Sequence, residues 1–171
     1  MIRRSAPILL LSACFAGGAF VPAASAQDMT FSPAATEECL AESGDRNGCV
    51  GQSAELCMED SPGGYSTMGM NACIRLELEY WDDRLNVAYG ELMAQEKTMD
   101  AELAADGTQV SSVAEALREM QRAWIPFRDA SCAYERARWT NGSGAGPAEA
   151  SCLMVMTGRQ ALALEDWMEG L

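Results

Sequence analysis

The chain has 171 residues, of which 49% are hydrophobic, so we expect one domain with a substantial buried core. It carries 25 acidic and 12 basic residues, and the resulting net charge of −13 disfavours binding to nucleic acid or anionic membrane surfaces. The absence of histidine removes the usual general base near neutral pH and the commonest metal ligand.

Residues 1–26 have the pattern of a secretory signal peptide. Arg3 and Arg4 form a basic start, residues 8–21 are mostly apolar, and residues 24–26 (Ala-Ser-Ala) fit a cleavage site. The apolar run is too short to span a bilayer. We therefore expect cleavage after Ala26, a periplasmic or secreted protein, and a mature net charge of −15 once the two leader arginines are removed.

A second interpretation of the leader centres on Cys14. Residues 11–14 (Leu-Ser-Ala-Cys) resemble a bacterial lipoprotein processing box, which would leave a lipid anchor on Cys14. The box lies early in the leader, and a second apolar stretch and the Ala-x-Ala site follow it. Simple cleavage is therefore the favoured interpretation.

Six cysteines remain after the leader, and an even number in an exported chain predicts disulfide bonds rather than buried free thiols. They are Cys39, Cys49, Cys57, Cys73, Cys132 and Cys152. No pair has C-x-x-C spacing, so the sequence gives no support for a thioredoxin-like redox site.

The N-terminal part of the mature chain differs in composition from the rest. Residues 27–36 are expected to form a flexible N-terminal segment, and residues 37–69 a cysteine-rich extension with turn chemistry at 43–48. Its short helical segments bury little surface alone. We expect a disulfide-stapled cap on a helical core formed by residues 70–171.

Three longer helices are predicted in that core, at about residues 70–97, 113–139 and 147–169. Their apolar residues recur with spacings of three and four. The stripes are Ile74, Leu78, Trp81, Leu85, Ala88 and Leu92; Val113, Leu117, Met120, Trp124, Phe127, Ser131 and Tyr134; and Leu153, Met156, Gln160, Ala163 and Trp167. No segment alternates convincingly with period two, so we predict an all-α antiparallel three-helix bundle.

Two local features of the second helix are also predicted. Pro126 should kink the helix rather than end it, because the apolar stripe continues in phase beyond it. Ser112 and Glu115 have the spacing of a capping box at the helix start.

A hairpin of the first two helices would turn near residues 102–104, so facing residue numbers would sum to about 205. Cys73 then faces Cys132, which predicts a disulfide, and Asp82 faces the segment 122–128, which predicts a salt bridge to Arg122 or Arg128. Cys39–Cys49 would close a short loop and leave Cys57–Cys152. That is one of fifteen possible connectivities.

A polar cluster accompanies this hairpin and could be interpreted as catalytic, since paired carboxylates perform acid–base chemistry. Its members are Asp82, Asn86, Gln121, Arg122, Trp124, Arg128 and Asp129. Acids beside arginines stay ionised, whereas a general acid must hold a proton. A structural clamp that fixes helix register is therefore favoured, and we expect no catalytic residues.

The remaining motifs do not indicate a cofactor. Met68 with Met70, and Met154 with Met156, could suggest a copper(I) site, but residues i and i+2 point apart on a helix. Methionine as core filler is the better interpretation. The glycine-rich run at 142–146 lacks the strand and lysine of a phosphate-binding loop. No metal or cofactor is expected.

Several segments match a known family in order over about residues 57–165. They are 70–73 (MNAC); Asp82, Leu85, Asn86, Tyr89, Leu92 and Met93; Leu117, Gln121, Arg122, Trp124, Phe127, Arg128, Asp129 and Cys132; and Cys152 with Thr157. This set resembles the LprI-type lysozyme-inhibitor domain family of exported bacterial proteins. The run from Gln121 to Cys132 is its most specific part.

The resemblance implies a small, exported, helical and non-catalytic protein whose partner is a lysozyme. Lysozymes of the common host type are basic, so an acidic partner would associate with them quickly. Occlusion of the enzyme's cleft would use a loop, and the candidates are residues 63–69, 100–106 and 141–146. The alternative function is that of a structural or interaction protein of the cell envelope with no lysozyme role.

Overall fold

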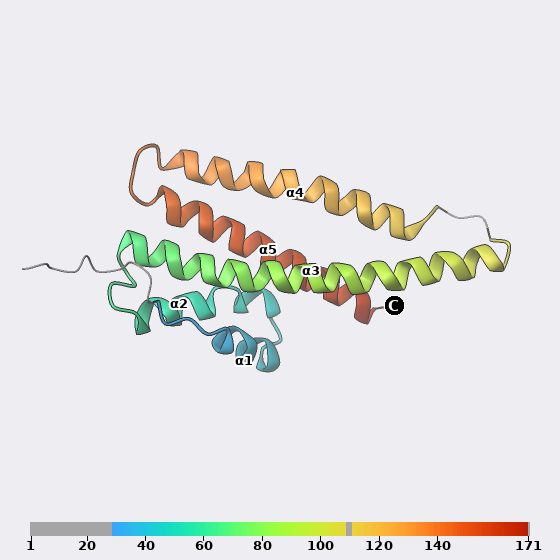
Figure 1. Cartoon of the computed structure of the whole chain (residues 1–171), viewed down its shortest axis with the longest axis horizontal. Coiled ribbons are helices and arrows are strands. Elements are labelled where there is room, and N and C mark those ends of the chain that lie inside the picture. The colour runs from blue at the N-terminus through green and yellow to red at the C-terminus, as the bar shows by residue number, and fades with distance from the viewer. Residues whose placement is uncertain (1–28, 109–110, 171) are drawn as a thin grey trace, which may run out of the picture.

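The computed structural model describes residues 29–108 and 111–170, so the predicted signal peptide and Cys14 lie outside the described residues. The described chain is helical and contains no strand, which confirms the all-α prediction. Its elements are α1 (Ala34–Glu42), the short 3-10 helix η1 (Arg46–Cys49), α2 (Gln52–Asp60), α3 (Thr67–Ala105), α4 (Val113–Arg138) and α5 (Ala145–Glu169) (Figure 1). None of these helices is long and apolar enough to cross a membrane.

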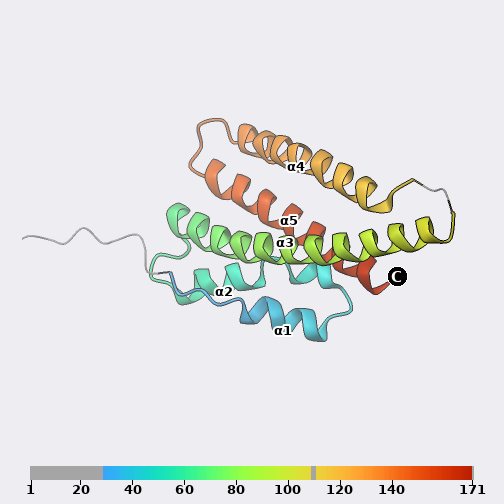
Figure 2. The same cartoon turned by 45° about the vertical axis from the view of Figure 1, so that its right-hand side comes forward.

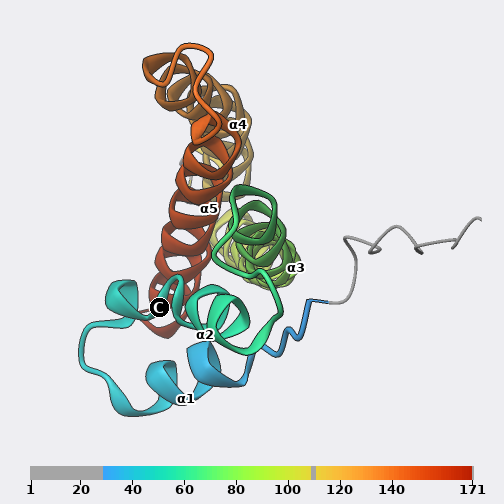
Figure 3. The same cartoon turned by 90° about the vertical axis from the view of Figure 1, so that its left-hand side faces the viewer.

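The helices α3 and α5 form the central pair of the molecule. α4 packs mainly on α5 at one edge, while α2 packs on the opposite side against α3 and α1 packs on the outside of α2 (Figures 2 and 3). The long helices therefore form the predicted bundle, and the cysteine-rich extension covers one side of it.

α3 begins at an N-cap formed by Ser66, whose Oγ accepts a hydrogen bond from the Gly69 amide at 3.0 Å. Its predicted stripe is confirmed, because Ile74, Trp81, Leu85, Ala88 and Leu92 are buried and Leu78 is partly buried. The helix ends at Ala105, eight residues beyond the predicted end at residue 97. This extra length moves the turn between α3 and α4 along the chain.

α4 continues through Pro126, in agreement with the stripe that stays in phase beyond it. Its buried side is nevertheless different from the predicted stripe and consists of Ala114, Leu117, Gln121 and Cys132. Phe127 and Tyr134, predicted to face the core, are 63% and 66% exposed. The prediction was wrong here because α4 is an edge helix that presents a partly polar face to α5.

The predicted stripe of α5 is also displaced. The buried residues are Ala145, Ala150, Met154, Thr157, Gly158, Ala161, Leu162 and Leu164, whereas Trp167 is 48% exposed. The close contact uses small residues: a Cβ on Gly158 would lie 2.9 Å from Val50 Cγ2 and 3.1 Å from Trp81 Cδ2. The spacing of the large residues therefore did not mark the contact face.

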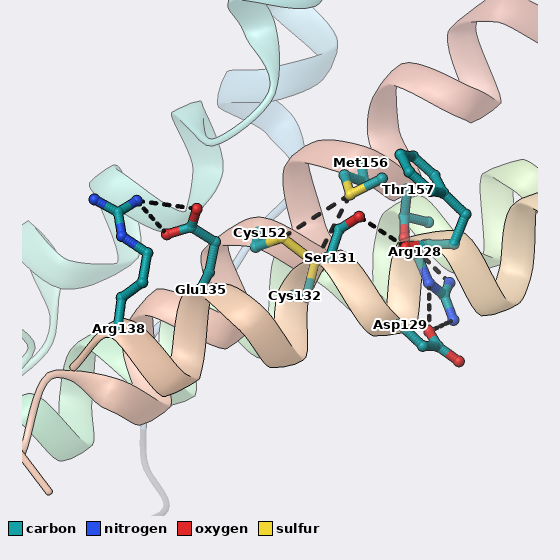
Figure 4. Close-up of a disulfide and its surroundings, with 10 residues drawn as sticks. Arg128, Asp129, Ser131, Cys132, Glu135, Arg138, Cys152, Met156 and Thr157 are labelled. Carbon is teal, nitrogen blue, oxygen red and sulfur yellow. Dashed lines mark hydrogen bonds and ion pairs between the residues drawn. A yellow bond between two sulfur atoms is a disulfide. The ribbon is translucent and has the colours of Figure 1, made fainter. Parts of the chain in front are cut away.

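Three disulfides link the described chain: Cys39–Cys49, Cys57–Cys73 and Cys132–Cys152. The first confirms the prediction, while the predicted Cys73–Cys132 and Cys57–Cys152 pairs were wrong. Because α3 is longer than predicted, Cys73 does not face Cys132. Cys132 instead pairs with Cys152, 20 residues further along the chain, and this disulfide joins α4 to α5 (Figure 4).

The extension is attached to α3 through Glu77, a carboxylate with 0% exposure. Its Oε1 accepts hydrogen bonds from the Thr36 hydroxyl at 3.0 Å, the Gly51 amide at 2.7 Å and Trp81 Nε1 at 2.9 Å. Its Oε2 accepts from the Ala54 amide at 2.6 Å. Glu77 therefore satisfies the free amides at the start of α2 and joins α1, α2 and α3.

Thr36 and Ser53 complete this buried contact between the two short helices. The Thr36 amide donates to Ser53 Oγ at 3.0 Å, and the Ser53 amide donates to Thr36 Oγ1 at 3.1 Å. Each helix start is thus capped by a side chain from the other, which is possible only when the two helices are packed together.

Replacing Glu77 with glutamine should destabilise the protein by about 2–3 kcal/mol, because an amide nitrogen cannot accept the bonds that the carboxylate accepts. The measurement is urea unfolding of the oxidised protein. Glu79→Gln removes the same charge from an exposed position on α3 and should change stability by less than about 0.5 kcal/mol. Equal stabilities for the two variants would contradict this role of Glu77.

Candidate functional site

Arg128 is the centre of the polar cluster that the sequence indicated. Its side chain is 17% exposed, lies over the Trp124 ring at 5.0 Å, and pairs with Asp129 at 2.8 Å. Nη1 lies 4.0 Å from Asp82 Oδ1. It also donates to Thr157 Oγ1 at 3.4 Å (Figure 4). The predicted Asp82–Arg128 salt bridge is present at this distance, and Arg128 contacts α3, α4 and α5.

The other members of the cluster lie around this contact without forming a reactive centre. Asn86 donates to Asp82 at 3.3 Å, and buried Gln121 accepts a hydrogen bond from Gln160 at 3.1 Å. Arg122 is exposed and makes no ion pair with another described residue. The arrangement supports the interpretation of a clamp between helices.

A hollow of about 250 Å³ lies beside this clamp. It is lined by Leu78, Glu79, Asp82, Asp83 and Arg128. Arg128 already places a positive charge near Asp82 there. This hollow is therefore a weaker candidate for binding a cationic ligand.

A larger groove, of about 450 Å³, lies where the second half of α3, the start of α4 and the end of α5 meet. This volume is within the range of small-ligand sites. The groove is lined by Leu92, Glu96, Val113, Ala116, Leu117, Met120, Asp166, Trp167 and Gly170, and its surface is mainly apolar. We call it the terminal groove.

Glu96 places a buried carboxylate in the terminal groove. The residue is 6% exposed, and its buried Oε2 receives no hydrogen bond from any described residue. Asp166, the other acid of the groove, is paired with Arg46. A buried carboxylate oxygen without a donor is costly, so the groove suits a ligand that brings a positively charged donor on an apolar stem.

The acidic segment 100–106, predicted as a loop, instead forms the C-terminal end of α3 and its C-cap Asp106, and it lies at the same end of the molecule as the terminal groove (Figure 1). Glu102 and Asp106 are exposed there. Asp100 instead binds the start of α4, accepting hydrogen bonds from the Ser112 hydroxyl at 2.6 Å and the Val113 and Ala114 amides at 2.9 and 3.2 Å. The Ser112 and Val113 bonds lower the pKa of Asp100 below its usual range.

Ser112 also accepts a hydrogen bond from the Glu115 amide at 3.0 Å, which confirms the forward half of the predicted capping box. The Glu115 side chain does not complete the box and pairs with Arg118 instead. Asp100 takes over its role as the acidic group at the helix start.

The other two candidate loops lie at the opposite end of the long helices (Figure 1). In the first, the Tyr65 hydroxyl donates to Glu55 at 2.9 Å, and this bond raises the pKa of Tyr65. In the second, Gly144 lies against the Trp139 ring, where a Cβ would come within 2.5 Å of a ring carbon. Neither loop adjoins the terminal groove.

Glu77 and Glu96 were the residues that reasoning from the sequence missed. Each is four residues from a buried member of the α3 stripe, Glu77 before Trp81 and Glu96 after Leu92. An acid in register with a buried apolar stripe was therefore the available signal. Only the packed structure shows that one has donors and the other has none.

One of the comparisons with known proteins identifies a family. The family model described as "Lysozyme inhibitor LprI" matches residues 57–164. An uncharacterized protein of Rhizobium meliloti (strain 1021) is 30% identical over 104 residues, which cover 61% of this chain and 75% of the relative. No solved structure matches the chain significantly. The matched region holds α3 and α4 entirely, whereas α1 and η1 lie outside it.

Asp100→Asn should lower the Tm by about 2–4 °C at pH 7, because α4 loses its charged cap. Since the folded pKa of Asp100 is lowered, its contribution is present above the ordinary value of 3.8 and is lost as the pH falls through the folded pKa. Thermal unfolding between neutral pH and about pH 2 should therefore show the difference shrinking.

Asp106→Asn is the matched control for this measurement, since Asp106 is exposed in the same acidic segment. It should leave the Tm nearly unchanged at each pH. A difference between wild type and Asp100→Asn that stays constant on acidification would contradict the assignment.

Proposed function

The chain belongs to the LprI lysozyme-inhibitor family, and from this membership we propose that it is an exported, non-catalytic inhibitor of a lysozyme-like muramidase. The observation that carries the proposal is the family match over residues 57–164. That region contains most of the α3–α4–α5 bundle and six of the nine residues that line the terminal groove.

Export is the first part of the proposal. Three disulfides suit an oxidising compartment outside the cytoplasm. The leader pattern adds cleavage after Ala26, with release of the mature chain into the periplasm or the medium.

Intact-mass spectrometry of the exported protein should give a chain that begins at Gln27 and contains three disulfides. Cys14→Ser should be exported with the same mature mass, because Cys14 is removed with the leader. A lipid-modified N-terminus at Cys14, or loss of membrane attachment in Cys14→Ser alone, would contradict cleavage after Ala26.

Electrostatic attraction is the second part of the proposal. A mature net charge of −15 increases the rate of association with a basic enzyme. Added salt screens the attraction and reduces this rate enhancement. The exposed acids Glu102 and Asp106, at the end of α3, lie at the same end of the molecule as the terminal groove. This end of the molecule is therefore the surface that we assign to the enzyme.

Insertion of a lysine or arginine side chain of the enzyme is the third part. Its charged group would supply the donor that Glu96 Oε2 lacks, and its stem would lie against Leu92 and Leu117. The half-exposed Trp167 ring offers a cation–π contact at the groove. Binding there would hold the inhibitor across the enzyme's substrate cleft.

Glu96→Gln should weaken inhibition of a basic lysozyme by about 10- to 100-fold, the loss expected for one hydrogen bond between charged groups. The measurement is lysozyme-driven clearing of a cell-wall suspension with added inhibitor. Glu91→Gln is the control, since it removes the same charge from an exposed position on α3.

The outcomes test the inhibitory function and the location of the inhibitory surface separately. Full lysozyme activity at micromolar excess of the wild-type protein would contradict the proposed function. Equal inhibition by wild type and Glu96→Gln would leave the function in place and exclude the terminal groove as its surface.

A second candidate function is that of an interaction protein of the cell envelope without a lysozyme role. The exposed aromatic residues Phe127 and Tyr134 on α4 favour a further protein contact. A pull-down from periplasmic extract that returns a dominant partner other than a muramidase would support this alternative.

A further inference from the structure

The outward side of α4 carries an unbroken apolar stripe. Its residues alternate with spacings of four and three, the pattern of a coiled-coil seam. They are Ala116, Met120, Ala123, Phe127, Ala130, Tyr134 and Ala137, and all except the half-buried Met120 are exposed. We call this set the outer stripe, and no charged residue interrupts it.

The outer stripe is unusual because the inward side of the same helix is partly polar. Gln121 and Arg128 face α5, whereas Phe127 and Tyr134 are 63% and 66% exposed. A helix with a partly polar inner side and an exposed apolar stripe is expected to have a second packing partner. α4 lies at the edge of the bundle, so its outer side is accessible (Figure 3).

We propose that the outer stripe pairs with the outer stripe of a second copy of this chain, with the two α4 helices antiparallel. The stripe alternates small and large residues, and one antiparallel register places a small residue opposite each large one. In that register Ala123 faces Phe127, Met120 faces Ala130, and Ala116 faces Tyr134, so each facing pair of residue numbers sums to 250.

This register is favoured by packing. Interdigitated large and small side chains fill an interface at the density of a protein interior. A parallel pair would instead place Phe127 against Phe127 and Ala123 against Ala123, leaving voids beside the alanines. A two-fold axis near residue 125 satisfies the antiparallel register and gives the closed symmetry of a homodimer.

Charge also favours α4 as the contact between two copies. The helix carries Arg118, Arg122, Arg128, Arg136 and Arg138 against Glu115, Glu119, Asp129 and Glu135, a net charge of +1 in a chain of −13. Two copies repel each other through the rest of their surfaces. α4 is the long helix along which they can approach without that repulsion.

The stripe from residue 116 to residue 137 is about 32 Å long, at 1.5 Å per residue. A single helix pair is a small interface, so we expect a dimer that dissociates on dilution. Ala116 and Met120 also line the terminal groove, so the second copy would lie along one rim of it. The dimer does not depend on the proposed muramidase.

Light scattering and sedimentation of the full exported, oxidised chain test the proposal over about 1–200 µM. The wild type should change from monomer to dimer in this range, and Phe127→Glu should remain monomeric. Ile125→Glu is the control, because Ile125 lies on another side of the same helix and is 43% exposed. It should dimerise like the wild type.

The second measurement tests the register. A benzophenone amino acid placed at residue 130 should crosslink to Met120 of the other copy in the antiparallel dimer. Tyr134→Glu, a second exposed stripe position, should also abolish the dimer while the unfolding temperature stays unchanged. A monomeric wild type, a dimeric Phe127→Glu, or crosslinks between two copies of residue 130 alone would each overturn the proposal.

Discussion

The buried carboxylate of Glu77 is the contact on which the arrangement of the N-terminal half depends. It lies inside the region that defines the family, but three of its four donors, Thr36, Gly51 and Ala54, come from the segment before that region. The carboxylate loses its hydration on burial, and these three donors, together with Trp81 Nε1, compensate for the loss. The extension is therefore a structural requirement of α3 in this chain, and the adjacent Cys57–Cys73 disulfide holds it in the same place.

α5 determines how the remaining helices pack. Its small residues allow close contact, so Gly158 lies against Val50 and Trp81 and brings the extension and α3 together on one side. On the other side, Cys132–Cys152 and the Gln121–Gln160 hydrogen bond attach α4. α4 is therefore held by a covalent bond and polar contacts as well as by its buried Ala114 and Leu117. Phe127 and Tyr134 are left on the outside.

The sequence correctly predicted the features that depend on residues close together along the chain. The α3 stripe, the Ser112 cap and Cys39–Cys49 all follow from spacings of a few residues, and they were found correctly. The Asp82–Arg128 contact tolerated an error in the position of the turn because arginine is long. The predictions of the two remaining disulfides did not tolerate this error, because a disulfide needs α-carbons about 5–6 Å apart. The α5 stripe failed because the contact is made by small residues, which a search for large apolar ones overlooks.

α3 shows the difference between a structural acid and a binding acid. Glu77 and Glu96 both occupy positions in register with its buried stripe, and both are removed from water. The chain encloses Glu77 with its own donors, and it leaves Oε2 of Glu96 without one among the described residues. Stability alone would favour an apolar side chain at position 96, because an uncompensated carboxylate in an apolar groove costs free energy. Its presence is therefore better explained by a cationic partner than by folding, and the acidic end of α3 would attract that partner.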